Sequence, residues 1–264
     1  MVEKWETVEY SILVMSSDGY SDLWEPFASN FKRYWSDCPA QIYLATETKR
    51  SDNGLFKNIK CGEEMAWTKR LGYALNQVDT DYLIMLCEDY LLNDVVNNHE
   101  IDVLMNSAKA YKAGNLRLVP NPKSDLRFTE NRDFYSYEKD VPYRISMQAG
   151  IWAKDYLMRY SDLDTNIRGF ERLGSHRSNL YNDPILTTDR YVFPFVDSVH
   201  KGKWELAALN MCSKNGIAVD LEYRPPMTNL DYLKKHGKGV IMESAPVFTS
   251  KIMNFAANLK KSFS

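Results

Sequence analysis

Three short apolar runs alternate with two segments of helical periodicity in the first part of the chain. The runs, residues 10–15, 40–47 and 82–87, are short and bounded by turn-forming residues, which is typical of buried strands. The segments 23–35 and 63–78 place their apolar residues on one side of a helix. This alternation is the pattern of parallel βαβ units. We therefore expect an α/β fold with a mixed, mainly parallel central sheet flanked by helices.

The chain after residue 98 is less regular. We expect a helix over 99–114 that closes at Gly114, because glycine is common just past a helix end. No internal repeat or persuasive domain boundary is present, so residues 1–264 are expected to form a single domain. The other expected elements are strands within 116–122 and 143–152, a short helix over 153–162, a helix beginning near Phe170 and a helix within 196–216.

The composition excludes several kinds of function. The net charge is −2, so no basic excess is available to neutralise nucleic-acid phosphates, and no nucleic-acid partner is expected. The four cysteines lie far apart and match no zinc-site spacing. The sequence also lacks a P-loop, a serine-hydrolase elbow and a zinc-protease motif.

The sequence shows neither the pattern of a secretory signal nor that of a membrane span. The first apolar run follows acidic residues instead of a basic start, and no run reaches the roughly 18 apolar residues that a membrane span needs. We expect a cytoplasmic protein. Residues 248–263 have the pattern of a basic amphipathic helix. Such a helix either packs on its own domain or makes a peripheral contact with the inner face of a membrane.

Two adjacent carboxylates, Glu88 and Asp89, follow the third apolar run directly. In open parallel sheets, ligands bind at the carboxyl ends of the strands. A carboxylate pair at such an end can hold one hard divalent cation, Mn²⁺ or Mg²⁺, that also contacts substrate phosphates. A structural or purely electrostatic role for the pair stays open.

The element formed by Cys87, Glu88 and Asp89 resembles the Asp-x-Asp motif of GT-A type glycosyltransferases, in particular bacterial enzymes of surface polysaccharide synthesis. The resemblance implies a GT-A-like (Rossmann-like) fold and a nucleotide-sugar donor. Asp89 matches the last acid of the motif, which binds the metal on the donor diphosphate. Cys87 stands where the family has the first acid, so this sequence departs from the family's motif at one metal-ligand position.

Two later segments extend the resemblance. "MQAGIWAKDYL" (147–157) is similar to a segment in which a glutamine and a tryptophan line the sugar pocket, which implies that role for Gln148 and Trp152. "RGFERLGSHR" (168–177) resembles the aromatic-x-Glu element of inverting enzymes, which implies that Glu171 is the catalytic base. A salt bridge within this arginine-rich segment is the alternative role of Glu171.

A basic segment, "VHKGKW" (199–204), resembles a loop that closes over the donor diphosphate. This implies that Lys201 and Lys203 contact the donor. His200 would either complete the metal site with Asp89 or be a surface histidine.

The nucleotide is expected near the end of the first strand. The resemblance implies contacts from Ser16, Asp18 and Tyr20, with a plain loop as the alternative. Arg70 resembles a basic position on the helix before the acid pair, from which it would reach a phosphate. The alternative for Arg70 is a position on a solvent-exposed face of the helix, with no role in binding.

The resemblance thus implies a glycosyltransferase that moves a sugar to a glycan or lipid-linked oligosaccharide acceptor. Residues 8–120 would bind the nucleotide-sugar, 121–210 the acceptor, and 211–264 would form a C-terminal extension. A non-catalytic carbohydrate-binding protein is one alternative, because aromatic residues make up 13% of the chain. A nucleotidyltransferase acting on sugar phosphates is the other, although the turn at 16–22 contains one glycine and no basic residue.

Overall fold

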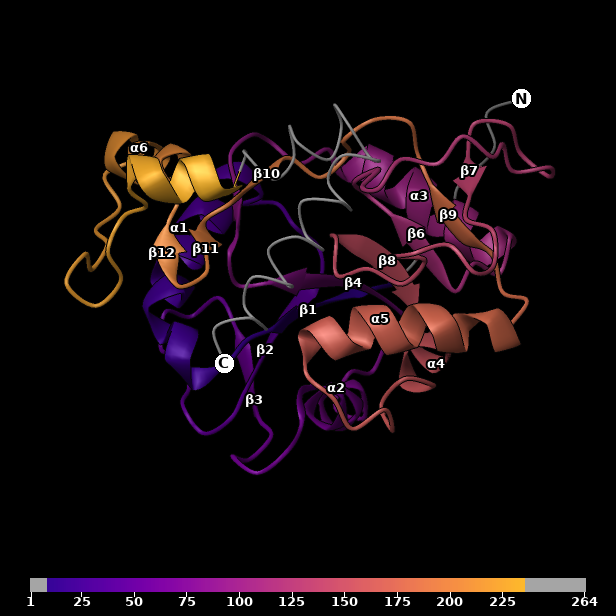
Figure 1. Ribbon diagram of the computed structural model, residues 1–264, viewed down its shortest axis with the longest axis horizontal. Helices are drawn as coiled ribbons and strands as arrows, with labels where there is room; N and C mark the ends of the chain where they lie inside the picture. The colour runs from indigo at the N-terminus through magenta and orange to yellow at the C-terminus, as the bar shows by residue number, and fades with distance from the viewer. Residues whose placement is uncertain (1–8, 236–264) are drawn as a thin grey trace, which may run out of the picture.

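The computed structural model describes residues 9–235, and its centre is a mixed eight-stranded sheet in the order β3-β2-β1-β4-β8-β6-β9-β7 (Figure 1). Strands β3, β2, β1 and β4 run parallel, whereas β8 is antiparallel to both β4 and β6. This confirms the expected α/β fold. The strands are β1 Ser11–Met15, β2 Gln41–Thr46, β3 Lys57–Lys60, β4 Tyr82–Cys87, β6 Asn115–Arg117, β7 Tyr135–Ser136, β8 Gly150–Ala153 and β9 Ile185–Thr187.

Helices cover both faces of this sheet. Figure 1 shows α2 (Trp67–Leu75), α4 (Lys154–Met158) and α5 (Ile167–Arg177) together on one side, and α1 (Trp24–Tyr34) and α3 (Asn98–Ala110) on the other. In α1, side chains four residues apart lie on the same face of the helix. Its Phe27 and Phe31 rings are accordingly stacked with centroids 5.8 Å apart and buried in the core.

Strands β1 and β4 lie side by side and end at the same edge of the sheet. Met15, the last residue of β1, is in register with Cys87, the last residue of β4. Nearly every side chain in both strands is buried, which explains why they read as continuous apolar runs. Ser16 and Glu88 therefore leave the sheet together at the carboxyl edge, where such sheets bind ligands.

A two-residue turn made of Glu88 and Asp89, called the acid turn below, connects β4 to β5 (Tyr90–Leu92). Strand β5 pairs antiparallel with β10 (Phe195–Asp197). A hairpin of β11 (Val199–His200) and β12 (Lys203–Trp204) follows, and then α6 (Leu206–Lys214).

Several boundaries differ from the sequence-based expectation. Helix α3 ends at Ala110 and not at Gly114, because Lys112 adopts a positive φ of 48° that ends the helical turn. Gly114 instead lies against the Tyr156 ring, where a Cβ would come within 2.6 Å of it. Strand β8 is limited to 150–153, so most of the expected strand 143–152 is irregular. Residues 248–263 lie outside the described part of the chain.

Candidate functional site

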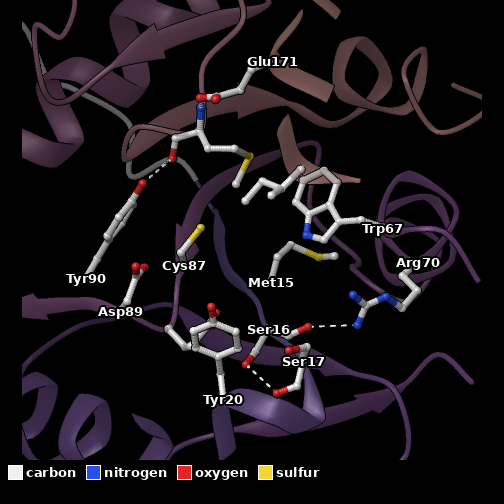
Figure 2. Close-up of a pocket in the computed structure, with 13 residues that line it drawn as sticks. Met15, Ser16, Ser17, Tyr20, Trp67, Arg70, Cys87, Asp89, Tyr90 and Glu171 are labelled. Atoms are coloured by element: carbon white, nitrogen blue, oxygen red, sulfur yellow. Dashed lines mark hydrogen bonds between the residues drawn. The ribbon is translucent and has the colours of Figure 1, made fainter. Parts of the chain in front are cut away.

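A pocket of about 400 Å³ lies at the carboxyl ends of β1 and β4 (Figure 2). Figure 2 shows side chains from β1, α2, the acid turn and α5 converging on it. The structure thus brings together residues that lie far apart in the chain. Those expected from the sequence are Ser16, Tyr20, Arg70, Glu88, Asp89 and Glu171.

The acid turn places two carboxyl groups close together in a poorly hydrated position. Glu88 is buried, and desolvation together with the neighbouring Asp89 raises its pKa well above the usual range. Asp89 is half-buried, and desolvation followed by repulsion from Asp197 raises its pKa to about 7. A raised pKa in adjacent acids means that the pocket favours a cation or a shared proton at this point.

These shifts make stability depend on pH. The pKa of Asp89 is higher in the folded protein than in the unfolded chain. Its contribution to the free energy of unfolding is therefore fully present below the unfolded pKa and is lost as the pH rises through about 7. Without divalent cations, Asp89→Asn should therefore stabilise the fold at pH 8, by on the order of 3 kcal/mol, and change little at pH 4. Urea unfolding in the presence of a chelator measures this. Equal effects of the substitution at both pH values would contradict it.

Glu171 enters the pocket from the first turns of α5, which begins after an Asn166 side-chain cap. Its Oε1 accepts hydrogen bonds from the Met147 backbone N–H at 2.9 Å and from the Ser146 hydroxyl at 3.2 Å. Both donors bind the same oxygen, so neither of these hydrogen bonds engages Oε2. Glu171 forms no ion pair with Arg168 or Arg172 among the described residues, so the salt-bridge alternative is not what the structure shows.

Arg70 reaches the pocket from α2 but is already paired. Its guanidinium lies 2.5 Å from a Glu47 carboxylate oxygen and donates to the Ser16 carbonyl at 3.0 Å (Figure 2). It is buried, and within the described residues its Nε has no hydrogen-bond partner. The alternative of a solvated helix face is therefore wrong. Arg70 braces the end of β1, and its buried Nε has no partner among the described residues.

A buried ion pair beneath Tyr20 was not expected from the sequence. Arg224 donates to both carboxylate oxygens of Asp22, at 2.8 and 2.9 Å, and lies 4.6 Å from the Tyr20 ring centroid. It also donates to the Gly19 carbonyl at 3.2 Å. Arg224 thereby attaches a late segment of the chain to the loop that carries Tyr20. Its charge offsets a small part of the rise that desolvation causes in the pKa of both acids in the acid turn.

Removing one partner of this pair should be costly. Arg224→Met leaves the Asp22 carboxylate buried without a counter-charge, so we expect a loss of about 3–5 kcal/mol in the free energy of unfolding. The double variant Arg224→Met with Asp22→Leu should recover much of this loss. Denaturant unfolding tests both. A loss below about 1 kcal/mol in the single variant would show that the pair is not needed for stability.

Asp18 and Trp152, both expected near the donor, do not line the pocket. The Asp18 carboxylate accepts hydrogen bonds from the backbone N–H groups of Thr48 and Lys49, so it fixes a loop. Trp152 is fully buried in β8, between β4 and β6. Gln148 is half-buried and is also absent from the lining.

The hairpin β11–β12 does not bring its basic residues to the pocket lining. Lys203 pairs with Asp231 at 2.8 Å, and Lys201 occupies the hairpin turn with a φ of 50°. His200 is half-buried on β11, and desolvation lowers its pKa. Over residues 9–235, no group of three histidine, cysteine, aspartate or glutamate side chains converges as a metal site would. The expected site of Asp89 with His200 therefore has no third protein ligand there.

Other lining residues were missed by sequence reasoning. Trp67 lies one helical turn before Arg70 on α2 and is half-buried, 5.1 Å from the Phe170 ring. Its spacing of three from Arg70 could have placed both on one helix face. Tyr90 and Met147 also line the pocket.

Comparisons with known proteins concern the fold. No protein-family model matches this chain, and no curated protein sequence is significantly similar to it. A fragment of TarS from S. aureus, residues 1–349, is similar over 71% of this chain at 10% identity, with a TM-score of 0.46. The match covers 59% of that fragment, so this chain spans less than two thirds of its length.

Two further solved structures are similar. A CMP:2-keto-3-deoxy-manno-octonic acid synthetase complexed with CTP matches 72% of this chain and 93% of its own, at 14% identity and a TM-score of 0.46. A UDP-glucose pyrophosphorylase complexed with UDP-glucose matches 72% of this chain and 92% of its own, at 7% identity and a TM-score of 0.45.

None of the helices between residues 9 and 235 has the length and apolar character that a membrane span requires.

Proposed function

We propose that the pocket is the active site of an inverting glycosyltransferase, which moves a sugar from a nucleotide-sugar to a glycan or lipid-linked acceptor. The observation that carries this proposal is that Glu171, held through one oxygen only, lines the same pocket as the acid turn. Inverting transfer needs a carboxylate to take the proton of the acceptor hydroxyl. It also needs positive charge beside the departing diphosphate.

Glu171 supplies the carboxylate in this proposal. Hydrogen bonds from Met147 and Ser146 hold Oε1, so Oε2 is oriented to accept the acceptor proton as the hydroxyl attacks the anomeric carbon. Met147 and Ile167 line this part of the pocket with apolar surface and limit the access of water. The proton stays on Glu171 until the product leaves.

The acid turn fits a divalent cation. Its two carboxyl groups have raised pKa values, and no lysine or arginine within the described residues forms an ion pair with either. Mg²⁺ commonly takes one or two carboxylates together with substrate phosphates, which fits a site without a third protein ligand. Asp89 and Glu88 would hold the ion, and a bound cation would neutralise the charge that develops on the leaving diphosphate.

The donor nucleotide would lie at the end of β1. Ser16 and Tyr20 line the pocket there, and the half-buried Trp67 ring offers an apolar surface for a base or a sugar. The Arg70 guanidinium, with its unpartnered Nε, is the cationic group on this side.

A binding screen tests the proposed donor site. Thermal unfolding is measured with UDP, GDP, CMP and their sugars, each with and without Mn²⁺. A nucleotide at about 100 times its Kd should stabilise the fold by ~2.7 kcal/mol. We expect such a shift with one nucleotide class and in the presence of the cation. Shifts with simple sugars but with no nucleotide would favour a carbohydrate-binding protein, and turnover that releases pyrophosphate from a nucleoside triphosphate would favour a nucleotidyltransferase.

A further inference from the structure

Two hydrogen bonds connect Tyr90, the residue next to the acid turn, with Glu171 through the backbone of Met147. Tyr90, which directly follows the acid turn, donates its phenolic hydrogen to the Met147 carbonyl at 3.0 Å. The N–H of the same Met147 donates to Glu171 Oε1 at 2.9 Å. Figure 2 shows Tyr90 reaching from the acid-turn side toward the backbone beneath Glu171. The Tyr90 side chain and the Met147 backbone therefore connect the two carboxylate-bearing parts of the pocket.

The Tyr90 side chain is fixed in place. It is 7% exposed, and its ring stacks on Phe195 with centroids 4.3 Å apart and an interplanar angle of 30°. Phe195 belongs to β10, the strand that pairs with β5. The phenol therefore cannot swing away from Met147 without disrupting this stack.

Among residues 9–235, the backbone at Met147 belongs to no strand, because β8 begins only at Gly150. Side chains hold it instead. Arg117 donates to the Arg144 carbonyl at 2.8 Å, and the Ser175 hydroxyl accepts from the Ile145 N–H at 3.0 Å. Tyr90 provides the corresponding bond at Met147, the residue nearest the pocket.

We propose that Tyr90 is a positioning residue, whose hydrogen bond to the Met147 carbonyl sets the place of the Glu171 carboxylate relative to the acid turn. This inference rests on the proposed function, since it concerns how the base is aligned. The Tyr90 hydroxyl binds backbone and takes no part in the proton transfer. Its loss would let the Met147 N–H and the attached Glu171 shift, and a misplacement of about 1 Å can cost on the order of 100-fold in rate.

The test is Tyr90→Phe, which keeps the ring and its stack on Phe195 but removes the hydrogen bond. We expect kcat for sugar transfer to fall by about 10–100-fold, while the Kd for the nucleotide and the KM for the donor stay within about twofold of wild type. The matched control is Tyr160→Phe. It removes a buried phenol that donates to the Tyr156 hydroxyl at 2.7 Å, away from the pocket lining, and should leave kcat unchanged.

Each outcome decides the proposal. Wild-type kcat in Tyr90→Phe, an equal loss in Tyr160→Phe, or a raised KM with unchanged kcat would overturn the positioning role alone. Absence of transfer by the wild-type protein with every nucleotide-sugar would overturn the proposed function as well. If Tyr90→Phe does not fold, Phe195→Leu replaces it as the test. This variant keeps the Tyr90 hydroxyl but removes the ring that stacks on Tyr90. We expect kcat to fall in this variant too, by a smaller factor than in Tyr90→Phe.

Discussion

Glu171→Gln should lower kcat for sugar transfer by roughly 10²–10⁴-fold, because the amide has no basic oxygen to accept the acceptor proton. This corresponds to about 3–5 kcal/mol of transition-state stabilisation. The amide oxygen still accepts the hydrogen bonds from Met147 and Ser146, so the pocket should keep its shape. Steady-state kinetics with a saturating donor measures the loss, and calorimetry should show an unchanged nucleotide Kd.

Glu25→Gln is the matched control for this variant. Glu25 is an exposed glutamate of α1 whose side chain bonds only to Ser29 among the described residues. It should retain wild-type kcat. A Glu171→Gln protein that is as active as the control would remove Glu171 from the reaction and leave the proposed mechanism without a base.

Asp89→Asn should weaken cation-dependent nucleotide binding by about 100-fold, or ~2.7 kcal/mol. The amide keeps the size of the carboxylate but not its charge, and charge is what a hard cation requires. In the thermal screen, the cation should therefore add little to the nucleotide shift of this variant. Asp94→Asn is the matched control, since Asp94 is an exposed acid shortly after the acid turn. A variant that keeps the full cation-dependent shift would show that Asp89 is not a metal ligand.

The parts of the site that sequence reasoning located are those with a local pattern. An apolar run that stops at two acids predicts a buried strand with a carboxylate turn at its end, and β4 with Glu88 and Asp89 has this form. Glu171 was placed by a resemblance over a short segment, and the fold brings it to the same pocket. Its role as a base remains a proposal.

The parts that were missed depend on contacts between distant segments. Arg224 lies 202 positions from Asp22 in the chain, and a lone arginine before two prolines gives no local sign of a buried ion pair. Asp18 lies in a loop at a strand end, where a ligand-binding residue is expected. Its carboxylate instead accepts a hydrogen bond from a backbone N–H 30 positions away. Trp152 was expected at a sugar pocket, whereas the pairing of β8 with β4 and β6 buries it within the sheet.

The central claim is that this pocket transfers sugar from a nucleotide-sugar. The most direct measurement is the release of nucleoside diphosphate by the purified protein from a panel of nucleotide-sugars, with Mn²⁺ or Mg²⁺ and with a glycan acceptor or water. We predict release from one nucleotide class in the wild-type protein, and a loss of roughly 10²–10⁴-fold in Glu171→Gln. Release that is the same in Glu171→Gln, or no release from any nucleotide-sugar, would contradict the claim.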